Sequence, residues 1–303
     1  MADDKPTPAQ LEAMSAELEA SEDYRVVRRY QRVERYNEAP DASADVKKGV
    51  FLDLETTGLD SQTDRIIELA LVPFEFTADG KIYRVSGEYD EFEDPGVPIP
   101  PEVTALTGIS DDMVRGKRID EDRVREVLSD AAVVVAHNAG FDRPFAEARM
   151  PDFERFAWAC SFRQIPWFDE GVESGKLEYL AYRFGFFYEG HRATIDCLAG
   201  IHVLAQRLPK SGERALKTLL DTARRPTHRV WATNSPFETK DVLKKRGYRW
   251  NNGDDGRPKS WYADIEEDAL AEETQFLESE VYGRPTHVQS DRITAFKRFS
   301  DRV

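Results

Sequence analysis

The sequence predicts an α/β protein in which a mixed sheet of five strands is flanked by helices and followed by a small α+β module. Near residue 50, three strand-like segments follow one another, and after them strands alternate with amphipathic helical segments. After residue 208 the composition changes, and a second, shorter pattern of strands and helices begins. The length of 303 residues leaves room for a large domain of roughly 170 residues plus smaller units.

Residues 1–48 are predicted to form a helical extension and a linker. Pro8 suits the first turn of a helix, and apolar residues then recur at helical spacing, which predicts a helix over residues 8–37. Residues 38–48 have the composition of a linker. Two roles are open for this extension: docking on the following domain or recruiting a partner.

Residues 49–208 are predicted to form the large domain. The sequence Ala-Asp-Gly at residues 78–80 is typical of a hairpin turn. Helices are predicted at 121–128, 140–150, 177–184 and 193–208, with a short helical turn at 104–106. The five predicted strands are 50–54, 66–76, 81–93, 132–136 and 156–160.

The rest of the chain is predicted to contain a connector, a module and a tail. Residues 209–228 are expected to be a helical connector, and residues 284–303 a loose tail. Between them, residues 229–283 are expected to form a small basic α+β module. Its predicted strands are 229–232, 248–250 and 260–265, and its predicted helices are 238–246 and 267–282.

The charge of the chain is unevenly distributed. The net charge is −15, and residues 51–200 contain 15 Lys and Arg against 30 Asp and Glu, whereas residues 201–260 contain 14 against 6. The acidic excess therefore lies in the segment that contains the candidate metal-binding residues described below, and the basic excess lies in the segment that follows. This distribution suits an enzyme that holds phosphates beside its active site. For any single basic residue, a solvated surface position is the open alternative.

The composition also limits the compartment. No apolar stretch is long enough to span a membrane, and the polar, acidic first ten residues exclude a secretory signal. Cys160 and Cys197 form no disulfide framework, so we expect both to pack as small hydrophobic side chains. These features predict a cytoplasmic protein with no membrane partner.

Two acidic residues alternate with leucines in the first predicted strand. Successive side chains of a strand point to opposite faces, so Asp53 and Glu55 point one way and Leu52 and Leu54 the other. Two like charges in a buried strand repel each other and lose hydration unless a cation lies between them. A divalent metal ion meets this need. An edge strand with two exposed acids is the alternative, which the apolar flanks of the segment disfavour.

A second group of polar residues follows the apolar strand 132–136. Asp142 begins a helix there, where it either binds a metal or is an N-terminal acid favoured by the helix dipole. His137 and Asn138 are expected to shape the loop or contact substrate, with helix capping as the alternative.

His191 and Asp196 lie in the segment GHRATID and form a third group. Five residues apart on a regular helix, they would diverge by about 140°. They converge if His191 lies on the loop that enters the helix and Asp196 in the first turns. A neutral imidazole with a pKa near 6.5 is well suited to act as a general base. Taken alone, His191 is more often a surface or capping residue.

Together the three groups resemble one family, the DEDD exonucleases of the ribonuclease-H-like fold, in its histidine-bearing class. DLETTGLD resembles the first family motif, HNAGFD the second and HRATID the third, in the form typical of bacterial DNA polymerase III epsilon-type proofreading exonucleases. The segment LTGISDDMV at 106–114 resembles the family's substrate-contacting loop, and the whole resemblance spans residues 49–208. Within this loop, Thr107 stands where the family has His.

The resemblance implies a complete set of site residues. Asp53, Glu55, Asp142 and Asp196 would hold two Mg²⁺ or Mn²⁺ ions, and His191 would be the general base. The implied products are nucleoside 5′-monophosphates cut from 3′ ends. The implied contacts to the terminal nucleotide come from Thr56, Thr57 and Gly108. Phe141 either stacks on a base or belongs to the core.

The predicted module mixes cations with aromatic side chains. Single-strand binding surfaces combine these groups, but the interpretation we favour is that Trp250 and Trp261 form the core of the module. Its basic surface can still hold a strand. The residues concerned are Lys244, Lys245, Arg246, Arg249, Trp250, Trp261 and Tyr262.

The leading hypothesis is a metal-dependent 3′→5′ exonuclease that acts on single-stranded or frayed 3′ ends of DNA, in proofreading or repair. An RNA exonuclease of the same family is the nearest alternative, because the motifs do not separate the two substrates. A non-catalytic nucleic-acid-binding protein or an accessory subunit of a DNA polymerase belongs to a different class of function.

Overall fold

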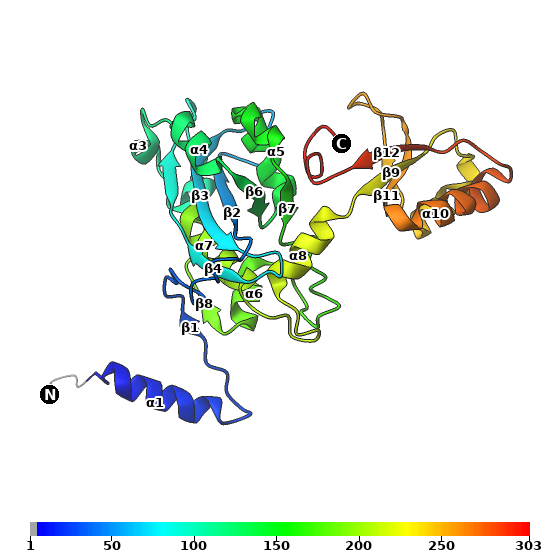
Figure 1. The fold of residues 1–303 in the computed structure, drawn as a ribbon. Helices are drawn as coiled ribbons and strands as arrows, with labels where there is room; N and C mark the ends of the chain where they lie inside the picture. The colour runs from blue at the N-terminus through cyan, green and yellow to red at the C-terminus, as the bar shows by residue number, and fades with distance from the viewer. Residues whose placement is uncertain (1–4) are drawn as a thin grey trace.

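A computed structural model describes residues 5–303, so the first four residues of the predicted extension lie outside the described part. Figure 1 shows a large α/β domain, a smaller α+β module beside it, and a helix that projects away from both. No helix of the described residues combines the length and apolar character that crossing a membrane requires.

The large domain is built on a mixed sheet of six strands. Its order is β4-β3-β2-β6-β7, and β5 also pairs with β3. The central strand β2 is antiparallel to β3 and parallel to β6, which is parallel to β7. The strands are β2 (Lys47–Thr56), β3 (Ile66–Phe76), β4 (Ile82–Val85), β5 (Tyr89–Phe92), β6 (Ala131–Ala136) and β7 (Trp158–Cys160).

This sheet confirms the predicted α/β fold of the ribonuclease-H-like type and corrects its strand count from five to six. The predicted strand 81–93 is two strands, β4 and β5, which both pair with β3. The break lies opposite Pro73 of β3, which has no N–H group to donate to the ladder. Its carbonyl still accepts a hydrogen bond from Ser86 N at 2.8 Å, and the chain bends there.

Helices cover both faces of the sheet. On one face α6 (Leu177–Arg183), α7 (Ala193–Leu204) and α8 (Ala215–Arg224) pack against Phe51, and on the other α4 (Glu121–Leu128) and α5 (Ala139–Arg149) cover Leu52 and Leu54. Two short helices, α2 (Pro101–Thr107) and α3 (Asp111–Val114), with the 3₁₀ turn Pro151–Arg155, complete the domain. Helix α8 lies in the predicted connector 209–228, but its buried leucines belong to the same core cluster as Phe51.

The N-terminal extension is helical only in its first part. Helix α1 spans Pro8–Glu19 and contains no buried residue, whereas the predicted helix 8–37 continues as extended chain. Strand β1 (Arg28–Arg29) pairs in parallel with β8 (Phe186–Phe187). Tertiary contacts explain why the chain after α1 is extended and not helical. Tyr30 and Tyr36 pack on the ring of His202, with ring centroids 5.4 and 5.7 Å away. Burial of two aromatic rings outweighs the local preference for a helix.

The module is an antiparallel sheet with helices on one face. Its strand order is β10-β11-β9-β12, with β9 (Thr227–Ala232), β10 (Arg249–Asn251), β11 (Ser260–Glu266) and β12 (Gln289–Ile293). Helix α9 (Lys240–Lys245) and helix α10 (Leu270–Phe276), which continues as the π-helical turn Leu277–Tyr282, supply its core, and the 3₁₀ turns are Phe237–Thr239 and Glu267–Ala269. Trp261 packs against this core, but Trp250 is 50% exposed, which corrects our prediction that both tryptophans are core.

The last twenty residues are ordered against both units, which differs from the predicted loose tail 284–303. Strand β12 pairs with β9, and residues 294–303, here called the strap, return to the large domain. The guanidinium of the fully buried Arg143 donates to the carbonyls of Ala295, Phe296 and Arg298 at 2.6–3.0 Å. Trp158 N, on the edge strand β7, donates to Ala295 O at 2.9 Å. The strap therefore covers one edge of the main sheet.

Candidate active site

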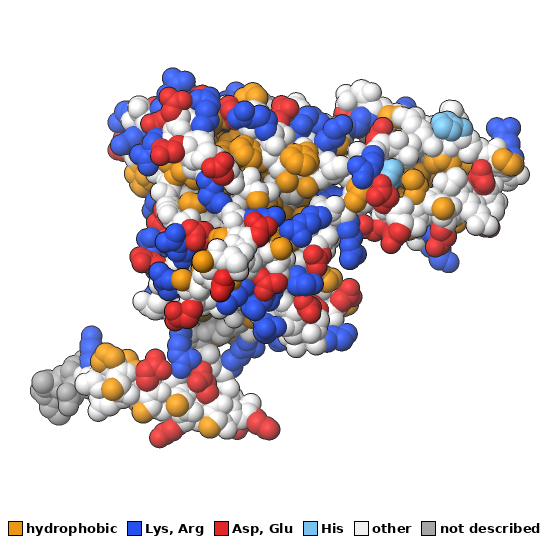
Figure 2. Space-filling view, viewed as in Figure 1, with side chains coloured by type: hydrophobic (Ala, Val, Ile, Leu, Met, Phe, Trp, Pro, Cys, Tyr) orange, Lys and Arg blue, Asp and Glu red, His pale blue; other side chains and the backbone are white. Residues whose placement is uncertain are grey.

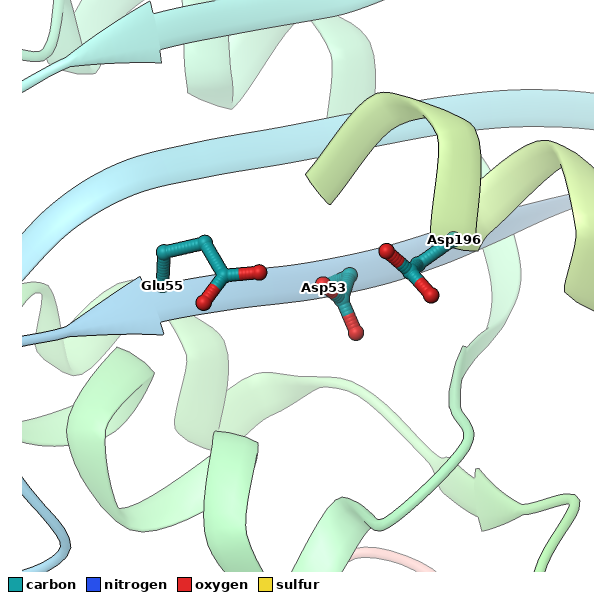
Figure 3. A group of neighbouring side chains, drawn as sticks. All are labelled: Asp53, Glu55 and Asp196. Carbon is teal, nitrogen blue, oxygen red and sulfur yellow. The ribbon is translucent and has the colours of Figure 1, made fainter. Parts of the chain in front are cut away.

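Two carboxylates project from the central strand toward helix α7. Asp53 and Glu55 alternate with Leu52 and Leu54, whose side chains lie in the core cluster on the opposite face. With Asp196 they form a group in which one oxygen of each carboxylate lies within 4.8 Å of the others (Figure 3). Alternation in the sequence predicted the first pair, and the fold adds the third member.

A close approach of α7 to β2 brings Asp196 over Asp53. A Cβ atom on Gly200 would lie 2.2 Å from Phe51 Cζ, so only glycine lets the helix lie this near the strand. The carboxylate of Asp196 is also held in place, because Tyr188 Oη donates to its Oδ1 at 3.0 Å and Arg192 N to its Oδ2 at 3.2 Å. Sequence reasoning missed Tyr188, since a tyrosine before Glu-Gly-His matches no motif we considered.

A buried glutamate on the neighbouring strand fixes the start of α7. Glu68 has no exposed surface and stands directly opposite Glu55 in the β2–β3 ladder. Its carboxylate accepts Ala193 N at 3.0 Å and the guanidinium of Arg192 at 2.9 Å. The charge of Glu68 is therefore compensated by a cation and a helix N-terminus. An acid inside the apolar run IIELALV was the signal that could have revealed it.

Asp142 reaches the site from the other side of the sheet. It lies in the first turn of α5 and is only 3% exposed. It lines the same cleft as Asp53, Glu55 and Asp196, although it is not a member of the group within 4.8 Å. The structure thus brings all four predicted carboxylates to one cleft, with three of them in closest contact.

His191 lies on the loop before α7, in the position that lets it converge with Asp196. Its backbone has the left-handed φ of 66°, which turns the chain between Gly190 and the first residue of the helix. The imidazole lines the cleft with the carboxylates. Among residues 5–303 no hydrogen-bond partner is found for its ring nitrogens, so both are available for solvent or substrate.

Burial and mutual repulsion raise the pKa values of the carboxyl groups. The pKa of Asp53 lies well above its usual value because of burial, and next because of the charges of Asp196, Asp142 and Glu55. Burial raises the pKa of Glu55 to about 8 and that of Asp142 to about 8. Burial also raises the pKa of Asp196. A divalent cation relieves this repulsion, and a set of carboxylate oxygens suits Mg²⁺ or Mn²⁺.

The cleft has a volume of about 410 Å³, and its lining contains one basic side chain besides two histidines. This side chain is Lys176, at the start of α6, which faces the cleft with Glu178 and the half-exposed Phe162. Sequence reasoning missed these three residues, because the segment between the second and third motifs carries no recognisable pattern. A single lysine among five carboxylates is a natural contact for a phosphate.

The predicted substrate residues of the second motif differ in whether their side-chain hydrogen-bonding groups are already engaged. His137 lines the cleft, but both ring nitrogens are occupied, by Ser161 Oγ at 2.9 Å and Gly175 O at 2.9 Å. Since a carbonyl can only accept, the ring donates from Nε2 and accepts at Nδ1. Asn138 begins α5 without a side-chain capping bond, so its amide remains available. Phe141 packs against the core and also lines the cleft.

The remaining predicted contacts do not line this cleft. Thr56 Oγ1 donates to Gly58 O at 2.5 Å, and Thr57 Oγ1 accepts Arg65 N at 3.0 Å, so both hydroxyls stabilise the turn after β2. Gly108 ends α2 in the left-handed conformation with a φ of 74°. Thr107 is buried, and its hydroxyl donates to Val103 O at 2.9 Å.

Residues 50–204 match the family described as exonuclease, of the RNase T type. The matched segment contains all three motifs and every residue of the acidic cleft. The chain belongs to the exonuclease family. This confirms the family expected from the motifs, and the large domain is hereafter called the exonuclease domain.

Relatives of the exonuclease domain include bacterial polymerases. The chain is 31% identical over 199 residues to a DNA polymerase III of PolC type from Clostridium perfringens, covering 60% of this chain and 13% of the relative. It is 40% identical over 201 residues to the PolC-type polymerase of Halalkalibacterium halodurans, covering 59% of this chain and 12% of that one. The chain thus spans about an eighth of the length of these relatives.

Solved exonucleases resemble the exonuclease domain more loosely. Exonuclease X in complex with 5′-overhanging duplex DNA has 26% identity and a TM-score of 0.42, covering 57% of this chain and 99% of its own. Exonuclease I of E. coli in complex with a 5cy-dT13 oligonucleotide has 16% identity and a TM-score of 0.47, covering 73% and 63%.

Proposed function

We propose that the protein is a metal-dependent 3′→5′ exonuclease that hydrolyses DNA from single-stranded or frayed 3′ ends and releases nucleoside 5′-monophosphates. The observation that carries the proposal is the meeting, in a single cleft of an exonuclease domain, of the four predicted carboxylates and the imidazole of His191, for which the described part of the chain offers no hydrogen-bond partner. The two free, buried cysteines are consistent with a reducing cytoplasm.

Asp53, Glu55, Asp142 and Asp196 are proposed to hold two Mg²⁺ or Mn²⁺ ions. When bound, a pair of such ions activates water and stabilises the charge that develops on the phosphate and on the leaving oxygen. The protein contributes the placement of the ligands. Tyr188 and the backbone of Arg192 orient the carboxylate of Asp196, and Glu68 fixes the helix that bears it.

His191 is the proposed general base. It accepts the proton of the attacking water, a role that an imidazole without a competing hydrogen bond can fill near neutral pH. The left-handed backbone at His191 belongs to the loop before α7, and the residue lines the cleft from that loop.

The substrate contacts are proposed on both sides of the carboxylates. Phe141 offers the face of its ring to a base, and the free amide of Asn138 offers donors and an acceptor. His137 shapes the wall, because its ring nitrogens are engaged. Thr56, Thr57 and Gly108 are proposed to contact the terminal nucleotide through the backbone of their turns, since both threonine hydroxyls are engaged.

The names of the relatives favour DNA as substrate. The PolC-type relatives are DNA polymerases, which supports a role in proofreading or repair and a polymerase as a partner. RNA is the second candidate substrate, because the carboxylate cleft itself carries no group that tells ribose from deoxyribose.

The proposal is tested by release of mononucleotides from 5′-labelled and 3′-labelled single strands. We expect the 3′-labelled strand to lose its label first and the 5′-labelled strand to give a ladder, and Asp53→Asn to lower the rate at least 1,000-fold, roughly 4 kcal/mol. Asp122→Asn, at an exposed acid of α4, is the matched control and should retain the full rate. Undiminished release by Asp53→Asn, or loss of the 5′ label first, would refute the assignment. Ribose oligomers run in parallel separate the two substrates.

A further inference from the structure

A second cavity separates the module from the exonuclease domain. Its volume is about 460 Å³, and its lining includes Arg163 and Gly140 from the exonuclease domain and Arg229 and Arg249 from the module. The module presents the face of its sheet that its helices leave uncovered. Tyr262, Arg249 and Arg229 lie on this face, as the strand registers show.

The cavity is joined to the active-site cleft through an intermediate hollow of about 400 Å³. The hollow shares Gly140, Arg163 and Asp301 with the interdomain cavity and Asn138 and Phe141 with the active-site cleft. A continuous path therefore leads from the carboxylates, past Arg163, to the uncovered sheet of the module. In Figure 2, Lys and Arg side chains are visible where the module meets the exonuclease domain.

We propose that this path binds single-stranded nucleic acid, namely the nucleotides that lie behind the one being hydrolysed. The inference rests on the proposed nuclease function, to which it adds a binding site for the body of the strand. The module is thus part of the substrate site and not a separate appendage.

The uncovered sheet face has the chemistry of a single-strand binding surface. The ring of Tyr262 lies between two guanidinium groups, with Arg229 and Arg249 each 4.9 Å from its centroid. Arg229 is held by Asp264 through bonds of 2.7 and 2.9 Å and serves as a fixed support. Arg249 is 60% exposed, and its ion pair with Asp264 is long, at 3.6 Å. Its guanidinium is therefore able to reach a phosphate or stack on a base.

Arg163 is the cationic group at the junction of the path. It is exposed, it lines both the intermediate hollow and the interdomain cavity, and no side-chain partner is found for it among residues 5–303. A phosphate on this path would therefore meet a guanidinium that no side chain of residues 5–303 engages.

The path also contains carboxylates, which bear on its affinity. Four arginines, Arg163, Arg229, Arg249 and Arg298, stand against Asp264, Glu266 and Asp301. Arg298 is committed to the carbonyls of Ala223 and Arg225. With Asp60 of the intermediate hollow, the path has four carboxylates against these four arginines. This balance of charge predicts a weak, salt-sensitive grip, which suits a strand that must advance after each cleavage.

The test measures binding in the Asp53→Asn background, where hydrolysis does not interfere. A fluorescein-labelled dT25 strand is titrated with protein at 50–200 mM NaCl, and Arg163→Ala/Arg249→Ala is compared with its parent. We expect about tenfold weaker binding at 100 mM salt. Removal of two phosphate contacts should reduce the slope of log K against log salt by about 1.4.

A matched control removes two positive charges elsewhere on the module. Lys259→Ala/Arg284→Ala changes two exposed residues that line neither cavity, and it should bind dT25 within twofold of the parent. An unchanged affinity and slope in Arg163→Ala/Arg249→Ala, or an equal loss in the control, would overturn the path. Failure of the nuclease proposal has a different signature, because the wild-type protein would then release no nucleotide while the binding data stand unaltered.

Discussion

The strap owes its attachment to one buried guanidinium, and we expect Arg143→Met to release it. Methionine preserves the length and the apolar stem of the side chain but removes its charge and all its donors. Arg143 donates to Glu147 Oε1 at 2.6 Å and to three strap carbonyls, and it lies 5.4 Å from the ring of Trp158. After the substitution the carbonyls lose these bonds, and Glu147 keeps its 2.7 Å bond to Arg302 of the strap only while the strap is attached.

The expected loss is about 3 kcal/mol. Removing one member of a buried ion pair costs roughly 3–5 kcal/mol. Burial also lowers the pKa of Arg143, which shows that desolvation offsets part of its gain and favours the lower end of that range. Since the strap can detach without unfolding the domain, the loss appears as local opening, about a hundredfold more frequent than in the wild type.

Hydrogen exchange at one amide reports this opening directly. Trp158 N donates to Ala295 O at 2.9 Å, so its exchange should accelerate about a hundredfold in Arg143→Met while the amides of β2 are unaffected. Arg302→Met is the control, because this side chain is 34% exposed and its pair with Glu147 is worth below about 1 kcal/mol. Wild-type exchange at Trp158 in Arg143→Met would show that something other than the guanidinium holds the strap.

Two further predictions concern the carboxylate cleft. Because the pKa of Glu55 and that of Asp142 are raised to about 8, Mn²⁺ must displace a proton from each. Its affinity should therefore fall roughly a hundredfold per pH unit below pH 8, measured by calorimetry between pH 6 and 8. The same raised pKa values mean that the metal-free fold binds more protons than the unfolded chain above about pH 4, so its melting temperature should decrease as pH rises toward 8. A melting temperature that does not change with pH would contradict the raised pKa values on which both expectations depend. Tyr188→Phe removes the 3.0 Å bond to Asp196, worth about 1.5 kcal/mol. It should therefore raise the Mn²⁺ concentration for half-maximal nucleotide release roughly tenfold. An unchanged Mn²⁺ concentration would show that Tyr188 does not orient the carboxylate of Asp196.

The parts of the fold that the sequence predicted well are those with strong local periodicity. The alternation in β2 identified the acidic face, and the boundaries of α4, α6 and β11 lie within a residue or two of their predicted places. The acid of the second motif and that of the third come together only through the sheet order and the close approach at Gly200, which no local pattern encodes.

The parts that the sequence could not predict depend on distant partners. Residues 20–37 have helical spacing, but the tyrosines leave the helix to bury their rings on His202. Strand β12 is polar and almost wholly exposed, so it lacks the apolar alternation by which strands are recognised. Tyr188 and Glu68 act through bonds to residues 8 and 125 positions away, which spacing alone does not reveal.

The strap also limits which fragments of this protein can be studied separately. Cutting the chain at residue 208 would remove the buried leucines of α8 from the main core and leave the hydrogen-bonding edge of β7 bare, and bare edges promote aggregation. A catalytic fragment that precipitates would then say nothing about what the module contributes to hydrolysis. Point substitutions in the intact polypeptide are the sounder way to measure the contribution of each unit, because the exonuclease domain depends on residues beyond position 208 for its core and its sheet edge.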